Sequence, residues 1–335
     1  MLGWALRRIM VAVPTLLVIA ALIFLLLDLA PGDPMAQIPM TVPDDVKAEM
    51  RRALGLGQPV HQRFGLWLWQ FFVVEPLVWC DASFGSDLSA GHARVISWQS
   101  RGPVVDLIAD RLPQTLWVVG LAYLIGVLAA LPIGLYSAYR QYGLFDHVAT
   151  FATMLAFSVP PFFSGVVLIV VFSSGLGWFP SVYDTTHRVS DLASLVTQAR
   201  QMVLPVLVVS LVTTAQISCY LRAAVLDNLG RDYVRMARAK GLSEWSVICV
   251  HVLRNSLIPL VSVVALGLPQ VFGGAIITEQ IFRVNGIGQL LITSLHANDL
   301  PTVQTITFLI AVLIVFSNLL ADLLYRLLEP RLRHD

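Results

Sequence analysis

The stretch LPQTLWVVGLAYLIGVLAALPIGLYSAY, residues 112–139, contains no Asp, Glu, Lys or Arg. A run of about 20 predominantly apolar residues is long enough to cross the hydrocarbon core of a bilayer as an α-helix. Five further stretches lack the same four residue types, namely residues 9–27, 148–183, 201–221, 255–278 and 303–321. The sequence therefore predicts an all-α membrane protein with six transmembrane helices.

Composition also separates the chain from soluble domains. Its 335 residues are 57% apolar and 13% charged, whereas soluble domains average roughly 25% charged residues, and the mean hydropathy is +0.75. The net charge of +1 gives no sign of a nucleic-acid partner. Three cysteines, Cys80, Cys219 and Cys249, form no Cys-x-x-Cys pair. We therefore predict neither a disulfide framework nor a metal site.

The order of apolar and polar stretches predicts three parts. Residues 1–29 form an N-terminal transmembrane helix, residues 30–111 a mixed polar subdomain, and residues 112–335 a core of five transmembrane helices with a loop at 227–250. Within the subdomain, residues 61–74 are typical of an amphipathic helix at a membrane interface. Its aromatic side chains are expected to mark the membrane surface rather than a ligand site, and they are Trp67, Trp69, Phe71 and Phe72.

Charges in the short loops predict the orientation. Arg7 and Arg8 precede a first apolar run that is too long for a signal peptide, so we expect an uncleaved helix. Six spans place both termini on one side, and the positive-inside rule makes that side the cytoplasm. The segments assigned there contain Arg7, Arg8, Arg140, Arg222, Arg231, Arg235, Arg238, Lys240, Arg254, Arg326, Arg331 and Arg333, whereas the short loops opposite contain Arg188, Arg200 and Arg283.

The predicted spans lack the groups that power many transporters. Ion-coupled transporters and proton pumps keep ionisable side chains inside the membrane, and the six stretches contain no Asp, Glu, Lys or Arg. The two lysines, Lys47 and Lys240, lie outside any G-x-x-x-x-G-K-[ST] phosphate-binding loop, and no H-E-x-x-H or G-x-S-x-G motif occurs. We therefore predict that the chain is not an enzyme, and that energy for uphill transport enters from another protein.

Proline and glycine interrupt two of the predicted spans. These residues are Ser158, Pro160 and Pro161 in the third span and Pro259, Gly273 and Gly274 in the fifth. Packed membrane helices tolerate Pro and Gly, which permit kinks and close backbone approach. Two interpretations stay open: ordinary helix packing, or a hinge beside the path of a solute.

The largest loop on the predicted cytoplasmic side, residues 222–254, is also the most basic stretch of the chain. Asp232 is expected to cap a short helix that stops at a left-handed Gly241. Ser243 and Glu244 then begin a helix that leads into the fifth span. One face of the short helix has the spacing for docking into a groove on another protein, and it comprises Tyr233, Met236, Ala237 and Lys240. The alternative is a solvated basic loop near anionic lipid.

The loop resembles a known coupling element. Residues 232–241, DYVRMARAKG, and residues 251–259, HVLRNSLIP, are similar to the EAA loop of ABC importer permeases of the dipeptide, oligopeptide and nickel branch. Arg235 stands where the general motif has Glu, and His251-x-Leu253-Arg254 where it has Ile-x-Leu-Pro; both departures are usual in this branch. Further matching motifs are Pro31-Gly32-Asp33-Pro34, Ser158-x-Pro160-x-Phe162-x-x-Gly165, Gly274-Ala-Ile-Ile-Thr278-Glu279-x-Ile281-Phe282, Gly286-Ile-Gly288, Asn318-Leu-Leu-Ala-Asp322-Leu-Leu-Tyr325 and Pro330-Arg331.

This resemblance implies the ABC importer permease fold, with a periplasmic subdomain between the first two transmembrane helices. It implies a bacterial inner-membrane protein with cytoplasmic termini. Its expected partners are a homologous second permease, two cytoplasmic ATPase subunits, a periplasmic or lipid-anchored substrate-binding protein, and membrane lipid. No cofactor is expected on this chain, because ATP and Mg belong to the ATPase subunits.

In that family the loop helix docks in a cleft of the ATPase and passes its closure on to the spans. The resemblance assigns coupling to Asp232, Tyr233, Arg235, Met236, Ala237, Arg238, Ala239, Lys240 and Gly241, with Ala237 and Gly241 as close-packing positions. Glu279 joins Ser158, Pro160, Pro161, Pro259, Gly273 and Gly274 as a pore or hinge candidate. The implied function is ATP-driven import of dipeptides, oligopeptides or related solutes, among them glutathione-like thiols, modified peptides and nickel chelates. The alternative is an ATPase-independent channel or facilitator for small solutes.

Overall fold

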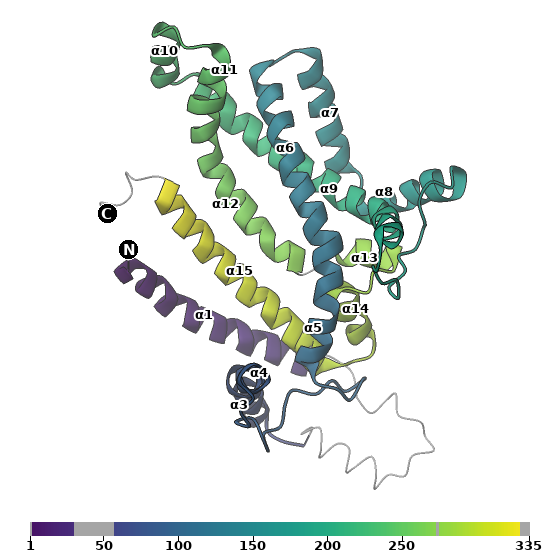
Figure 1. Cartoon of the computed structure of the whole chain (residues 1–335). Coiled ribbons are helices and arrows are strands. Elements are labelled where there is room, and N and C mark those ends of the chain that lie inside the picture. The colour runs from purple at the N-terminus through teal and green to yellow at the C-terminus, as the bar shows by residue number, and fades with distance from the viewer. Residues whose placement is uncertain (1, 30–56, 273–274, 329–335) are drawn as a thin grey trace. The chain divides into compact units, whose positions relative to one another are not determined.

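A computed structural model describes residues 2–29, 57–272 and 275–328, and these residues are mainly helical (Figure 1). In the described part of the chain the only extended pairing is an isolated antiparallel bridge between Ile96 and Pro103. The chain divides into two units. The first unit comprises Met1–Leu112 with Leu290–Val312, and the second comprises Pro113–Gln289 with Leu313–Asp335.

Long helices and π-helical turns alternate along the chain. The helices are α1 (Leu2–Asp28), α3 (Val60–Trp69), α4 (Glu75–Phe84), α5 (Val104–Thr115), α6 (Leu121–Tyr139), α7 (Leu144–Ser158), α8 (Pro161–Leu168), α9 (Leu192–Leu229), α10 (Asp232–Ala239), α11 (Glu244–Ser246), α12 (Leu253–Phe272), α13 (Ile276–Phe282), α14 (Ile287–His296) and α15 (Leu300–Leu328). The π-helical turns are η1 (Gln70–Val74), η2 (Leu116–Gly120), η3 (Ile169–Gly175) and η4 (Val247–Val252). Turns η1, η2 and η4 each join two helices, whereas η3 ends the helix that begins with α8.

Five of the six expected spans are continuous helices long and apolar enough to cross a membrane. They are Met10–Asp28, Val104–Tyr139, Leu192–Leu229, Glu244–Phe272 and Leu300–Arg326. Several extend well beyond the charge-free stretches, because a helix that leaves the hydrocarbon continues into the polar interface with charged residues. Helix α9, with 38 residues, is roughly 57 Å long at 1.5 Å per residue, against a hydrocarbon thickness of about 30 Å.

The third expected span, residues 148–183, is not one helix. Helices α7 and α8 meet at a bend of 105°, where Val159 and Pro160 have extended backbone with ψ of 119° and 140°. The sequence Pro160-Pro161 explains the break, because proline disfavours helical geometry in the residue before it and suits the first position of a new helix. Six spans are present if the bent pair counts as one.

Small residues bring α6 and α9 together in the second unit. One face of α6 repeats a buried small residue every four positions, at Ala122, Gly126, Ala130, Gly134 and Ala138. A Cβ atom added to Gly126 would lie 2.6 Å from the Cβ of Thr213, and one added to Gly134 would lie 2.8 Å from the carbonyl oxygen of Ser218. The backbones of the two helices therefore approach closely, as small-xxx-small faces allow in membranes.

A buried ion pair joins α7 to α9 near the ends of their apolar stretches. The carboxylate of Asp146 accepts hydrogen bonds from the guanidinium of Arg222 at 2.7 and 2.8 Å and from the backbone nitrogen of Tyr142 at 2.9 Å. The hydroxyl of Ser137, on α6, also donates to it. Three helices of the second unit are thus fastened together at one end by a single carboxylate with several donors.

In the first unit, α3, η1 and α4 form one continuous helical rod, residues 60–84, which ends at the left-handed Gly85. The expected interfacial helix at 61–74 is the first part of this rod. Its aromatic side chains divide between two faces. Trp67 is only 5% exposed and packs edge-to-face on Phe308 of α15 with ring centroids 5.3 Å apart, whereas Trp69 is 52% exposed. The expectation of a membrane surface therefore fails for Trp67, which belongs to the core.

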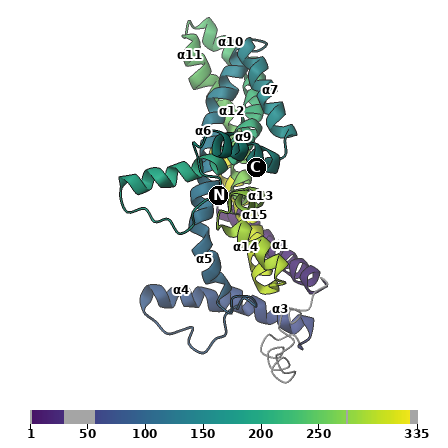
Figure 2. The same ribbon diagram turned by 90° about the vertical axis from the view of Figure 1, so that its right-hand side faces the viewer.

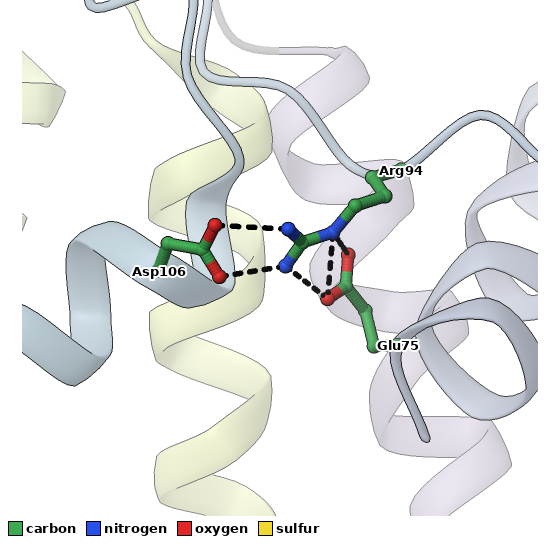
Figure 3. Close-up of polar contacts among 3 residues, drawn as sticks. All are labelled: Glu75, Arg94 and Asp106. Carbon is green, nitrogen blue, oxygen red and sulfur yellow. Dashed lines mark hydrogen bonds and ion pairs between the residues drawn. The ribbon is translucent and has the colours of Figure 1, made fainter. Parts of the chain in front are cut away.

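Arg94 holds the rod to the start of α5. Its guanidinium donates to the carboxylates of Glu75 on α4, at 2.7 Å, and Asp106 on α5, at 2.7 and 2.8 Å (Figure 3). These hydrogen bonds to Asp106 and Glu75 raise the pKa of Arg94. Asp299, just before α15, fastens the next segment by accepting hydrogen bonds from the Ser97 hydroxyl at 2.5 Å and the Trp98 backbone nitrogen at 2.8 Å.

The α6–α9 contact yields a stability prediction. Gly126→Ala or Gly134→Ala forces the two helices apart, and we expect each to lower the stability of the purified chain by about 1–3 kcal/mol, the usual cost of overpacking. The measurement is the apparent melting temperature in detergent. Gly120→Ala is the matched control, because its Cβ would meet the Val271 side chain at an ordinary 3.5 Å. Equal melting temperatures for all three variants would contradict the close contact.

Candidate functional site

Helix α10, the predicted coupling helix, projects with α11 beyond one end of α9 and α12 (Figure 1). Its N-terminus differs from the expectation. The residue that precedes the helix with extended backbone is Arg231, and no side chain caps the first amides. Asp232 is already the first helical residue, and its carboxylate contacts the Arg235 guanidinium at 3.4 Å instead. The predicted capping role of Asp232 is therefore wrong, because the helix begins at Asp232 itself, one residue earlier than that cap would require.

The C-terminus of α10 follows the prediction. Gly241 has a φ of +77°, its backbone nitrogen donates to Arg238 at 2.9 Å, and the nitrogen of Leu242 donates to Ala237 at 3.4 Å. This pair of bonds is the Schellman motif, which satisfies the last carbonyls of a helix. The Ser243 hydroxyl then accepts from the Ser246 nitrogen at 3.3 Å and starts the helix that runs without a break to Phe272.

Part of the predicted docking face of α10 is buried against the chain itself. Val234 and Ala237 are buried in a cluster with Ala138 of α6 and Val247 of the next helix. The Tyr233 hydroxyl donates to the Asn228 side chain at 2.6 Å. Two of the four residues predicted to face a partner, Tyr233 and Ala237, therefore pack against their own chain.

A second face of α10 remains exposed. It consists of Asp232, Arg235, Met236 and Ala239, at i, i+3, i+4 and i+7 spacing, and Arg238, Lys240 and Gly241 are exposed beside it. Met236 is 60% exposed, unusual for a large apolar side chain surrounded by charges. Arg238 donates to Glu244 at 2.6 Å, which closes the loop at its base and raises the pKa of Arg238.

The hinge candidates fall in different places. Ser158 ends α7, Pro160 precedes α8 and Pro161 begins it, so these three lie at the 105° bend. Pro259 lies inside α12, which continues through it. Gly273 and Gly274 lie outside the described residues, as do the motifs at 31–34 and 330–331.

Glu279 is fully buried in α13 and binds the start of α14. One carboxylate oxygen accepts from the Thr115 hydroxyl at 3.0 Å, and the other accepts from the backbone nitrogen of Gln289 at 2.9 Å. The Thr115 hydroxyl oxygen in turn accepts from the backbone nitrogen of Ile287 at 2.8 Å. The first amides of α14, which have no partner within their own helix, are thus satisfied by an acidic side chain, as the helix dipole favours.

Glycine is required on both sides of this carboxylate. A Cβ atom at Gly286 would collide with the Glu279 carboxylate and the Thr115 hydroxyl, and one at Gly288 would lie 2.9 Å from the Glu279 carboxylate. Burial raises the pKa of Glu279 more than its hydrogen bonds lower it. The structure thereby explains the spacing Glu279, Gly286, Gly288. Sequence reasoning did not find Thr115, whose position offers no local signal.

Comparisons with known proteins agree with the fold. Residues 130–334 match the family described as binding-protein-dependent transport system inner membrane component, and residues 1–119 match the N-terminal region of the same kind of component. The chain belongs to this permease family. The resemblance to the peptide and nickel branch of ABC permeases is confirmed by relatives that align over nearly the whole length.

Three relatives illustrate the branch. The permease is 32% identical to the oligopeptide transport system permease protein AppB of Bacillus subtilis, over 100% of both chains. It is 34% identical to a putative peptide transport system permease protein of Brucella abortus, over 98% of both chains. It is 32% identical to the glutathione transport system permease protein GsiC of Salmonella choleraesuis, over 100% of both chains. The permease is therefore a multi-pass inner-membrane component of an ABC transport system.

The buried carboxyl gives a pH-dependent prediction. The pKa of Glu279 in the folded permease is raised above its ordinary 4.5, so ionisation of this carboxyl opposes folding. The protonated carboxyl contributes most to stability below pH about 4.5, and this contribution is lost as the pH rises through the raised pKa. We expect the apparent melting temperature of the unmodified permease, relative to that of Glu279→Gln, to fall as the pH increases from about 4.5. A difference that does not vary with pH would contradict the assignment.

Proposed function

We propose that this permease forms half of the pore of an ATP-driven importer, and that α10 is the point where a separate ATPase subunit acts on it. The exposed face of α10, with Asp232, Arg235, Met236 and Ala239, carries this proposal. A partly apolar helical face that its own chain leaves open, at the tip of a helical hairpin, fits a groove on another protein. The family membership and the match of residues 232–241 to a coupling loop support it.

The inner side of α10 supports transmission of force. Val234 and Ala237 lie in the same buried cluster as residues of α6, α9 and α12, among them Leu221, Val225 and Leu260. Close-packed interiors resist compression. A push on the exposed face of α10 therefore moves the ends of α9 and α12 with it instead of being absorbed in the loop. In this arrangement Ala237 anchors α10 to the buried cluster of its own chain.

Orientation and partners follow from the same proposal. The excess of Lys and Arg in residues 222–254 supports a cytoplasmic position for α10 and both termini. Residues 30–111 then lie on the periplasmic side, where we propose that a substrate-binding protein docks. A homologous second permease completes the pore. Two ATPase subunits hold ATP and Mg, and this chain performs no catalysis itself.

The proposed solutes are dipeptides, oligopeptides or related compounds. The names of the relatives carry this proposal, since AppB is named for oligopeptides and GsiC for glutathione.

Substitutions on the exposed face of α10 test the proposal. We expect Met236→Glu or Ala239→Glu to reduce both peptide uptake and substrate-stimulated ATP hydrolysis at least tenfold in the reconstituted transporter, because a charge buried without a partner in an interface costs several kcal/mol. Asp227→Asn is the control, since Asp227 is exposed on α9 and pairs with Arg231.

Two results would oppose the proposal. Unchanged ATP hydrolysis and uptake in both α10 variants, with intact assembly, would show that the exposed face makes no coupling contact. Solute flux through vesicles that contain this permease alone, without ATP or partners, would favour the channel or facilitator instead.

A further inference from the structure

The rod of residues 60–84 carries an apolar stripe on its exposed side, in the first unit. Exposed positions recur along the rod at helical spacing. We call this set the outer stripe, and it comprises Leu66, Trp69, Phe72, Pro76, Trp79 and Cys80. No member is charged, and the two tryptophans are 52% and 64% exposed. A water-facing helix of a soluble subdomain shows the opposite distribution, with charges outside and apolar residues inside.

Two charged residues of the rod, Arg63 and Glu75, point to the inner side instead, whereas Asp81 accepts hydrogen bonds from Ser86, Leu88 and Ser89 in the loop that follows the rod. Arg63 pairs with Asp28 at the end of α1. Glu75 is almost completely buried beneath Arg94, which joins it to Asp106 (Figure 3). Water does not favour a helix that buries its ion pairs and exposes its aromatic side chains. Some other medium or molecule therefore covers the outer stripe.

Two membrane helices fix the depth of the rod. Asp28, the partner of Arg63, is the last residue of the span Met10–Asp28, and Phe24, one turn earlier, packs on Phe64 with ring centroids 5.3 Å apart. Phe71 and Phe72 pack on Phe308 of α15 at 5.2 and 5.7 Å. Phe308 lies about 12 Å along its helix from Leu300, at 1.5 Å per residue. The first half of the rod therefore lies beside the end of the span Met10–Asp28 and beside the first part of the span Leu300–Arg326.

The direction of the rod agrees with this depth. Helices α3 and α4 are seen end-on in Figure 1 and lengthwise in Figure 2, where they run across the end of α1 and α5 in the first unit. This direction fits a helix that lies in the plane of the membrane surface. Interfacial helices bury their apolar face about 5–10 Å into the boundary between headgroups and acyl chains.

We infer that residues 60–84 form a membrane-interface helix whose outer stripe rests in the headgroup region of the leaflet in which α1 ends. Lipid is the occupant that fits, because the rod packs on the end of α1 through Asp28 and Phe24, and only 11% of the span window of α1 is buried in the chain. Tryptophan also concentrates at the headgroup level of membranes.

The interface helix would hold the start of a membrane span at a set depth. Arg94 connects Glu75 in the rod to Asp106 at the beginning of the span Val104–Tyr139. Lipid contact along the outer stripe and the ion pairs on the inner side therefore act on the same helix from opposite sides. This keeps α5 at a constant level while other helices of the permease move.

Cys80 offers a direct test, because it lies on the outer stripe and is exposed. In a Cys219→Ser, Cys249→Ser background, a nitroxide spin label is attached to Cys80 of the complete transporter in vesicles of phosphatidylethanolamine and phosphatidylglycerol. Its collision rates with oxygen, which partitions into lipid, and with a neutral nickel chelate, which stays in water, are compared. We expect the ratio of oxygen to nickel accessibility to exceed one.

A matched control uses Ala90→Cys with Cys80→Ser, since Ala90 is exposed in the loop after the rod; its ratio is expected to fall below one. Ser83→Cys in the same background repeats the test one turn further along the rod. Greater access of the nickel chelate at positions 80 and 83 would overturn the inference in favour of water. Low access of both reagents there would overturn it in favour of a protein partner.

Discussion

The contact between α6 and α9 is the constraint on which the second unit depends. Gly126 and Gly134 leave no room for a side chain between the two helices, so their backbones meet directly. Helix α9 is long enough to cross the membrane and still reach α10, and Arg222 fastens it to Asp146 on α7 near that end. Because Val234 and Ala237 of α10 lie in the same packed cluster as residues of α6, α9 and α12, we propose that movement of α10 is passed on to the spans.

Two short helices outside the spans show how the chain satisfies its polar ends. The last carbonyls of α10 are bound by amides around the left-handed Gly241, and the first amides of α14 by the carboxylate of Glu279 with Thr115. Each end is satisfied within the chain. Helix α10 therefore needs no partner to form, and its exposed face with Met236 stays open for the ATPase that we propose.

Local chemistry made part of this fold predictable. Charge-free stretches predicted six spans, five of which are continuous helices, and Gly241 and Ser243 marked real helix boundaries. The proline pair was recognised as a possible hinge, but a bend of 105° depends on how α8 packs, which spacing along the chain does not encode. The repeat of small residues in α6 was visible in the sequence and is the signal that would have predicted the α6–α9 contact.

Contacts between distant residues were beyond prediction from the sequence. Helical spacing predicted one docking face from Tyr233, Met236, Ala237 and Lys240, but spacing does not tell which side turns toward its own chain. Tyr233 and Ala237 turn inward, and Met236 and Lys240 are exposed. The hydrogen bond from Thr115 to Glu279 links residues 164 positions apart. The buried position of Trp67 likewise depends on Phe308, far along the chain. The aromatic run at 61–74 indicated an interface, and only the packing shows which rings face outward.

The most direct test of the central proposal is site-specific photocrosslinking from α10 in the assembled transporter. A photoreactive amino acid is placed at the position of Met236, which is exposed, or of Val234, which is buried. The account predicts covalent adducts with the ATPase subunit from position 236 and none from position 234. Adducts from position 236 with lipid alone, or equal yields of ATPase adduct from both positions, would contradict it.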